Sequence, residues 1–171
     1  MGDDLQYKEY MLTAMINNSN KIKTFPTAGH QQPDVHKPMT IRILIADDHA
    51  LVRQTLCMLL ERAEGLEVVA EAENGQRALE LARELRPDVA LIDISMPRMT
   101  GLEATAHISQ LPQNTRVIVL SVHNNLLQTA LDNGASGYVL KQDSTSDLVE
   151  AIEQVYQGER FVSPRLVRST V

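Results

Sequence analysis

Residues 41–48 read IRILIADD, so that six mostly apolar residues are followed at once by two carboxylates. A short apolar run of this kind is typical of a strand that is buried on both faces of a sheet. Apolar residues at helical spacing come next, namely Val52, Leu56, Leu59, Leu60 and Ala63. The segment therefore predicts a buried strand followed by an amphipathic helix.

The same alternation continues along the chain. Further apolar runs of strand length lie at 68–70, 89–92, 117–120 and 137–140, and apolar helical stripes lie at 78–85, 102–108, 126–131 and 148–155. Five such strands alternating with five helices predict an α/β fold with a doubly wound, five-stranded parallel sheet of order 2-1-3-4-5, as in flavodoxin-like proteins. In these sheets the functional site lies beyond the carboxyl ends of the strands, near strands 1 and 3.

Polar side chains follow four of the predicted strands directly. Asp47 and Asp48 follow the first strand, Asp93 the third, Ser121 the fourth and Lys141 the fifth. Three carboxylates in one pocket repel one another unless a cation is present, and Mg²⁺ prefers such oxygen ligands. A carboxylate can also attack phosphorus, while an ammonium and a hydroxyl bind phosphoryl oxygens. The set therefore suits phosphoryl transfer to a side chain.

Each of these residues also has a simpler interpretation when it is taken alone. Asp47 and Asp48 precede a helix, where carboxylates commonly act as N-caps. Asp93 precedes Pro97 and Gly101 and fits an ordinary loop residue. A single Ser or Lys carries almost no information. The order of the whole set after strands 1, 3, 4 and 5 is what makes coincidence a poor explanation.

Composition restricts the possible functions. The net charge of −6 and the pI of about 5.3 argue against direct DNA binding by this chain, because contacts to phosphates need clustered Lys and Arg. The one cysteine, Cys57, cannot form an internal disulfide, and we expect a small buried thiol in a reducing compartment. The sequence has neither an apolar run of membrane-spanning length nor a secretion signal. We therefore expect a cytoplasmic protein that does not enter the membrane.

The two ends of the chain differ from the middle. Residues 1–38 are rich in Asn, Gln and Pro and have little apolar periodicity, which predicts a disordered or weakly helical tail. Translation from Met39 would remove this tail, so the tail is either native or an extension. We expect one domain over 39–158 and the start of an interdomain linker over 159–171.

Three segments carry a family resemblance. Residues 43–49 (ILIADDH), 93–103 (DISMPRMTGLE) and 134–141 (GASGYVLK) resemble the signatures of response-regulator receiver domains of two-component systems. The likeness covers roughly residues 40–157. Residues 48–53 (DHALVR) and the segment from Ala151 to Pro164 are similar to the NarL/FixJ subfamily.

The resemblance implies a role for each site residue. Asp93 would accept phosphate from a sensor histidine kinase or a phosphotransfer protein, and Ser121 and Tyr138 would then move inward as switch residues. Lys141 would pair with the phosphate, and Ser95 and His123 would tune dephosphorylation. Gln142 stands where many members have Pro. The implied Mg²⁺ ligands are Asp47, Asp48, Asp93 and the backbone carbonyl of Ser95.

The resemblance also bears on the output of the protein. NarL/FixJ members usually carry a C-terminal helix-turn-helix domain, for which the 171 residues leave no room. We therefore expect a phosphorylation-driven switch, and not an enzyme, which dimerises when phosphorylated and controls transcription through a DNA-binding domain absent from this chain. The alternative is a stand-alone receiver that binds a partner protein. A flavodoxin-like cofactor binder is disfavoured, because Asp47 and Asp48 would repel a cofactor phosphate.

Overall fold

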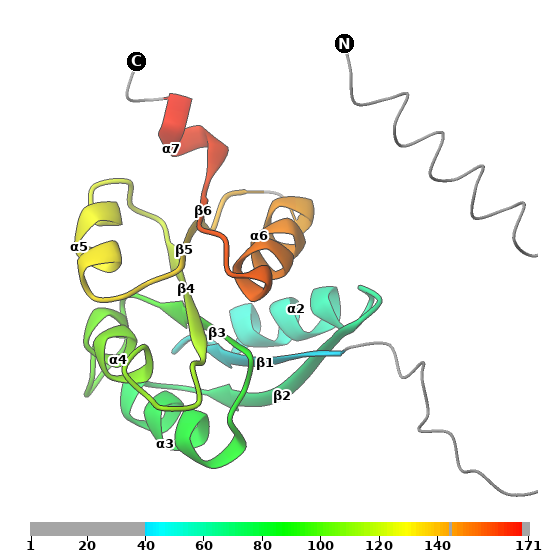
Figure 1. The fold of residues 1–171 in the computed structure, drawn as a ribbon, viewed down its shortest axis with the longest axis vertical. Helices are drawn as coiled ribbons and strands as arrows, with labels where there is room; N and C mark the ends of the chain where they lie inside the picture. Colours follow the sequence, from blue (N-terminus) through cyan, green and yellow to red (C-terminus); the bar gives the residue numbers. More distant parts are fainter. Residues whose placement is uncertain (1–39, 144, 169–171) are drawn as a thin grey trace, which may run out of the picture. The chain divides into compact units, whose positions relative to one another are not determined.

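The computed structural model describes residues 40–143 and 145–168. The predicted tail over 1–38 lies outside these residues. In the described part, helices and strands alternate as the sequence predicts (Figure 1). The strands are β1 (Ile41–Ala46), β2 (Leu66–Ala72), β3 (Val89–Asp93), β4 (Arg116–Ser121), β5 (Gly137–Leu140) and β6 (Phe161–Val162). The helices are α2 (Ala50–Leu60), α3 (Gly75–Leu85), α4 (Gly101–Ile108), α5 (Leu127–Asp132), α6 (Thr145–Gln157) and α7 (Pro164–Arg168).

The sheet is parallel throughout and has the order β2-β1-β3-β4-β5-β6. The predicted order of the first five strands is confirmed, but the predicted number of five strands is wrong. The sixth strand is only two residues long and pairs Phe161 with Gly137 and Val162 with Tyr138. Two residues are too short for a periodic pattern, and they fall in the segment that we expected to begin the linker.

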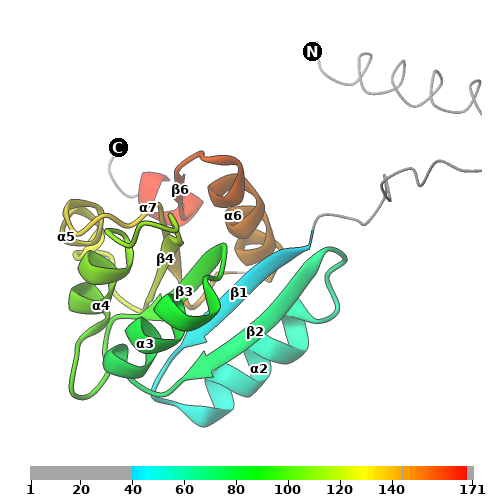
Figure 2. The same cartoon turned by 60° about the horizontal axis from the view of Figure 1, so that its bottom comes forward.

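Helices cover both faces of the sheet (Figures 1 and 2). Buried residues of α3 and α4, such as Leu79 and Ile108, form one core with one face of the strands, and Leu166 of α7 belongs to the same core. Buried residues of α6, such as Ile152, form a second core with the opposite face, and Leu60 of α2 joins them. Because β1, β3, β4 and β5 are buried between these two cores, their polar side chains meet water only at the strand ends.

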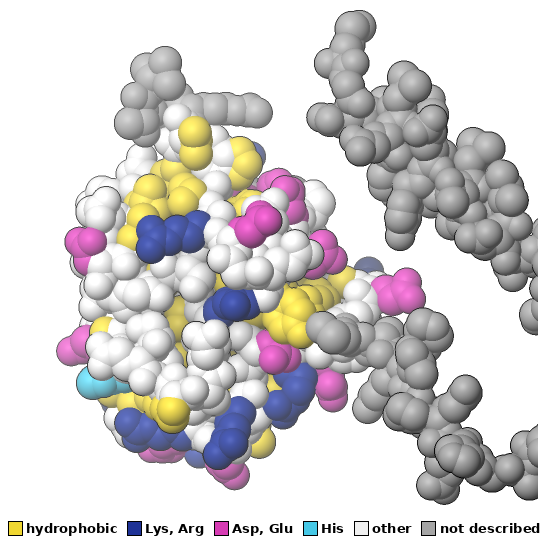
Figure 3. Space-filling view, in the orientation of Figure 1, with side chains coloured by type: hydrophobic (Ala, Val, Ile, Leu, Met, Phe, Trp, Pro, Cys, Tyr) yellow, Lys and Arg dark blue, Asp and Glu magenta, His cyan; other side chains and the backbone are white. Residues whose placement is uncertain are grey.

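The surface carries mixed charge. On the face drawn in Figure 3, Lys and Arg side chains are interspersed with Asp and Glu. This distribution agrees with the net charge of −6 and differs from the clustered basic surface of a nucleic-acid-binding domain. Among the described helices, none combines the length and the apolar character needed to cross a bilayer.

Cys57 lies on α2 and is only partly buried, where the sequence predicted a small buried thiol. Burial, together with the charge and a hydrogen bond of Glu71, raises the pKa of the Cys57 thiol from 9.0 to about 11. A higher pKa removes thiolate but makes the remaining thiolate more nucleophilic, so we expect alkylation at pH 8 to be about tenfold slower than for an ordinary thiol. Timed iodoacetamide labelling, with the urea-unfolded chain as the control, measures this difference; equal rates would contradict it.

Candidate functional site

The parallel sheet brings the predicted polar residues to one edge. Asp47 follows β1, Asp93 is the last residue of β3, Ser121 is the last of β4 and Lys141 follows β5. β3 lies between β1 and β4, so Asp93 occupies the centre of this edge. The apolar runs before these residues form the core of the sheet, and the chain therefore holds each polar group at a rigid strand end.

Lys141 joins two of the carboxylates. Its Nζ lies 2.6 Å from Asp47 Oδ2 and 2.8 Å from Asp93 Oδ1. The Asp47 side chain is fully buried and that of Asp93 is 6% exposed. Burial lowers the pKa of Lys141, but hydrogen bonds to Asp47 and Asp93 outweigh this effect and raise it. The ammonium therefore stays charged and screens the two carboxylates from each other.

The third carboxylate is the most accessible of the three. The Asp48 side chain is 33% exposed, and its Oδ1 lies 2.8 Å from Nδ1 of His49. The same Nδ1 lies 3.2 Å from Asp47 Oδ1, which also accepts a hydrogen bond from the His49 backbone N–H at 2.8 Å. The N-cap of α2 is His49, and its side chain makes no capping hydrogen bond. The interpretation of Asp47 and Asp48 as N-caps is therefore wrong.

These donors fit a hard divalent cation. One ligand atom from each of Asp47, Asp48 and His49 lies within 4.8 Å of the others. With Asp93, three carboxylates face a single ammonium, so the edge keeps an excess of negative charge. Mg²⁺ takes one or two carboxylates and keeps several waters, which matches two buried carboxylates beside an open one. Ser95 is exposed in the loop after Asp93, and its carbonyl as a further ligand stays a prediction.

Ser121 and Tyr138 meet at the loop that follows β4. The Ser121 Oγ accepts a hydrogen bond from the His123 backbone N–H at 2.9 Å, and the Tyr138 hydroxyl donates to the His123 carbonyl at 2.6 Å. Burial raises the pKa of Tyr138, although a hydrogen bond with Ser121 opposes this effect. Tyr138 is fully buried. Its movement as a switch residue stays a prediction.

Two residues at or near the site carry contacts that the sequence reasoning did not anticipate. The Arg53 guanidinium donates to the Asp47 carbonyl at 2.7 Å, and its Nε lies 3.4 Å from Glu71 Oε2. Arg53 follows the N-cap of α2 by one helical turn, and this spacing is the only signal for it in the sequence. Asp143 carries a carboxylate that is only 2% exposed. No periodic pattern indicates this burial, because Asp143 lies in a loop.

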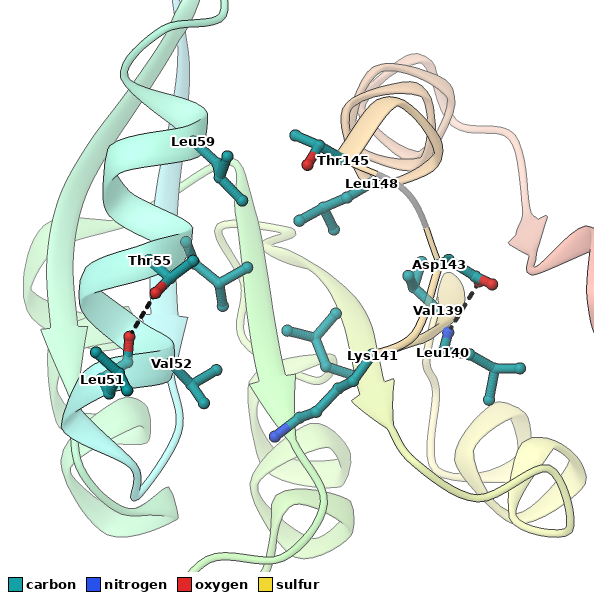
Figure 4. Close-up of a pocket in the computed structure, with 12 residues that line it drawn as sticks. Leu51, Val52, Thr55, Leu59, Val139, Leu140, Lys141, Asp143, Thr145 and Leu148 are labelled. Carbon is teal, nitrogen blue, oxygen red and sulfur yellow. Dashed lines mark hydrogen bonds between the residues drawn. The ribbon is translucent and has the colours of Figure 1, made fainter.

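An apolar pocket of about 350 Å³ adjoins the site. Figure 4 shows that its lining comes from α2 on one side and from α6 and the end of β5 on the other. Leu51 of α2, Leu148 of α6 and Lys141 after β5 are among the residues that line it. The long apolar stem of a lysine commonly packs on such surfaces while its ammonium reaches a polar partner.

Comparisons with known proteins agree with this geometry. The family profile "Response regulator receiver domain" matches residues 43–153. The chain is 39% identical over 130 residues to the response regulator GacA of Pseudomonas aeruginosa, which covers 75% of this chain and 61% of that protein. It is 38% identical over 133 residues to the transcriptional regulatory protein DegU of Brevibacillus brevis, covering 77% of this chain and 56% of that protein.

A solved structure gives the same result. A two-component response regulator of the LuxR family from Aurantimonas sp. SI85-9A1 superposes with a TM-score of 0.72 at 39% identity, covering 75% of this chain and 94% of that one. The chain spans about three fifths of the length of GacA and DegU. The matched part is their receiver region. The protein belongs to the response-regulator receiver domain family and is a signalling module of a two-component system.

Proposed function

We propose that Asp93 accepts a phosphoryl group. The observation that carries this proposal is the Lys141 ammonium, which lies within 2.8 Å of both Asp47 and Asp93 at the carboxyl edge of the sheet. Asp93 lies at the centre of the edge, and a donor would approach the small part of its side chain that is exposed. No lysine or histidine needs to take a proton, because the attacking group is already a carboxylate.

The transfer forms one bond and breaks one. An Asp93 Oδ attacks the phosphorus, the bond from phosphorus to the donor's leaving atom breaks, and the leaving group keeps the electron pair. The product is an acyl phosphate on Asp93. Mg²⁺, held by Asp47, Asp48, Asp93 and the Ser95 carbonyl, would supply charge neutralisation at the phosphoryl oxygens. Lys141 would pair with a further phosphoryl oxygen, and the Ser121 hydroxyl would donate to another.

The donor and the output follow from the relatives. We infer that the donor is a sensor histidine kinase or a phosphotransfer protein in the cytoplasm, where the single free cysteine Cys57 would remain reduced. GacA is a response regulator and DegU a transcriptional regulatory protein, and both extend beyond the region that matches this chain. We infer that phosphorylation favours a homodimer and controls transcription through a helix-turn-helix domain outside this chain, with a stand-alone receiver as the alternative.

The direct test uses acetyl phosphate as a small donor. We expect the intact mass of the protein to rise by one phosphoryl group in the presence of Mg²⁺ and to stay unchanged when EDTA removes the metal. Labelling of equal extent with and without metal would overturn the role of the acidic edge, and no labelling in either condition would overturn the proposal.

We expect Lys141 to be needed for the dimerisation response to phosphorylation more than for phosphorylation of Asp93 itself. In Lys141→Ala, Asp93 can still be phosphorylated, but the phosphoryl group loses its fixed cationic partner. A ligand shifts a two-state equilibrium only by the difference in contacts between the states, so the dimerisation response should fall several-fold. Sedimentation velocity with and without acetyl phosphate measures this response. Arg83→Ala, which removes an exposed cation on α3, is the control. An unaltered dimerisation response in Lys141→Ala would contradict the role of Lys141.

A further inference from the structure

Asp143 is a buried carboxylate that lies outside the acceptor site. Its side chain is only 2% exposed, although it follows Lys141 by two residues. It accepts a short hydrogen bond from the Ser163 hydroxyl and a longer one of 3.3 Å from the Leu140 backbone N–H. Its other oxygen lies 3.2 Å from Nε of Arg165. A buried charge is costly unless it is paired, so these contacts strongly favour one position of the side chain.

Two of these partners, Ser163 and Arg165, belong to the segment by which the chain leaves the sheet, here called the exit segment (β6 and α7, residues 161–168). Ser163 is fully buried. Its backbone N–H donates to the Tyr138 carbonyl at 2.9 Å, and its Oγ accepts from the Leu140 N–H at 2.8 Å. β6 extends the sheet next to β5. The exit segment is thus fixed to the strand that carries Tyr138.

The exit segment also contacts the core beside Tyr138. Leu166 is 7% exposed and belongs to the same apolar cluster as Tyr138 and Ala130. Leu166 and Arg165 also line a cavity of about 380 Å³ together with His123, whose carbonyl accepts the Tyr138 hydroxyl. α7 therefore lies beside the loop after β4, to which the predicted switch residue Tyr138 is hydrogen-bonded.

One short turn connects this anchor to the acceptor site. The Lys141 backbone N–H donates to the Ser121 carbonyl at 2.8 Å, and the Asp143 N–H donates to the Leu140 carbonyl at 2.9 Å. From this turn the Lys141 side chain reaches Asp93, and the Asp143 side chain reaches Ser163. Lys141 and Asp143 therefore belong to one hydrogen-bonded turn, with only Gln142 between them.

We propose that Asp143 is a latch that fixes the exit segment to the turn carrying Lys141, and that a phosphoryl group on Asp93 tightens this latch. The second half rests on the proposed function. A phosphoryl group adds charge and acceptors that hold Lys141 and hence its turn, and a more rigid turn keeps Asp143 on Ser163. The coupling is reciprocal, so a closed latch also favours phosphorylation. Whatever follows the exit segment in the chain thereby senses the state of Asp93.

Hydrogen exchange of the full 171-residue chain tests the anchor first, without phosphate. Asp143→Ala should speed exchange of the backbone amides in the exit segment about tenfold or more, because the Ser163 hydroxyl and the Leu140 N–H lose a buried partner. Ser163→Ala, which removes only one oxygen, should act in the same direction and serves if Asp143→Ala folds poorly. Asp132→Ala, an exposed carboxylate at the end of α5, is the matched control and should leave exchange unchanged.

Acetyl phosphate with Mg²⁺ tests the coupling. In the unmodified protein, exchange in the exit segment should slow about fivefold or more, as expected for a typical coupling between two sites. In Asp143→Ala, the same treatment should change it less than about twofold. An exit segment that exchanges equally in the protein and both variants overturns the latch. If the exit segment is released in the variants but its exchange in the unmodified protein does not respond to phosphorylation, the anchor stands and the coupling is overturned.

The failures of the two proposals are distinguishable. Intact mass reports labelling of Asp93 on the same samples, so absence of labelling removes the proposed function and the coupling together. The comparison of the unphosphorylated protein with Asp143→Ala and Ser163→Ala does not depend on labelling, and it decides the anchor alone.

Discussion

Asp93→Asn is expected to abolish phosphoryl incorporation from acetyl phosphate. An amide is a poor nucleophile and forms no acyl phosphate, so the reaction loses its attacking group. Asp47 cannot substitute, because its side chain is fully buried and its Oδ2 is held by Lys141. Intact mass after incubation with acetyl phosphate and Mg²⁺ measures the loss.

The fold should survive this change. Lys141 keeps its 2.6 Å pair with Asp47, and the repulsion between two adjacent carboxylates is removed. Circular dichroism should therefore match that of the unmodified protein, and Asp132→Asn, an exposed carboxylate, should label normally. Undiminished labelling of Asp93→Asn would place the acceptor elsewhere.

Gly101→Ala is expected to give the largest loss of stability among these variants. A Cβ at this position would lie 1.9 Å from the Asp93 carbonyl oxygen and 2.8 Å from Ile94 Cα, and both are backbone atoms. α4 therefore begins against the loop that carries the acceptor, fixed there by the capping box of Thr100 and Glu103. Overpacking against backbone should lower the free energy of unfolding by about 3 kcal/mol, the upper end of the usual range. Urea unfolding measures this change.

Gly158→Ala provides the comparison. Its φ of +98° makes any side chain strained, but the nearest atom to a Cβ is the end of Arg116, at 3.6 Å. Backbone strain alone should cost about 1 kcal/mol there. Equal losses of unfolding free energy in the two variants would contradict the larger cost expected from close packing at Gly101. Gly101→Ala should also label more slowly than Gly158→Ala, because only the former displaces the backbone of Asp93.

The main features of the fold were predictable from the sequence because burial on both faces leaves apolar runs. Strands such as 89–92 and 117–120 contain no polar alternation, and the helices between them have clear apolar stripes. Gly134 follows the apolar stripe at 126–131 and has a left-handed φ of +90°, which a glycine adopts without strain and which ends the helical region. β6 was not predictable, since it is only two residues long, and the contacts of the following Ser163 are with Leu140 and Asp143, far back in the chain.

The site was predictable to the extent that strand ends determine it. Asp47, Asp93 and Lys141 each follow or end an apolar run, and parallel pairing alone brings them together. Contacts between loops and side chains were not predictable in the same way. The burial of Asp143 depends on Ser163, twenty residues further along the chain, and no local pattern encodes that distance.

The most direct measurement identifies the modified residue. Treatment with acetyl phosphate and Mg²⁺, followed by borohydride reduction and peptide mass spectrometry, converts an aspartyl phosphate to homoserine at its own position. We predict conversion of Asp93, with none when EDTA replaces Mg²⁺. Conversion of Asp47 or Asp48 in its place, or conversion of Asp93 that does not require the metal, would contradict the assignment of the acidic edge as a metal-dependent phosphoryl acceptor.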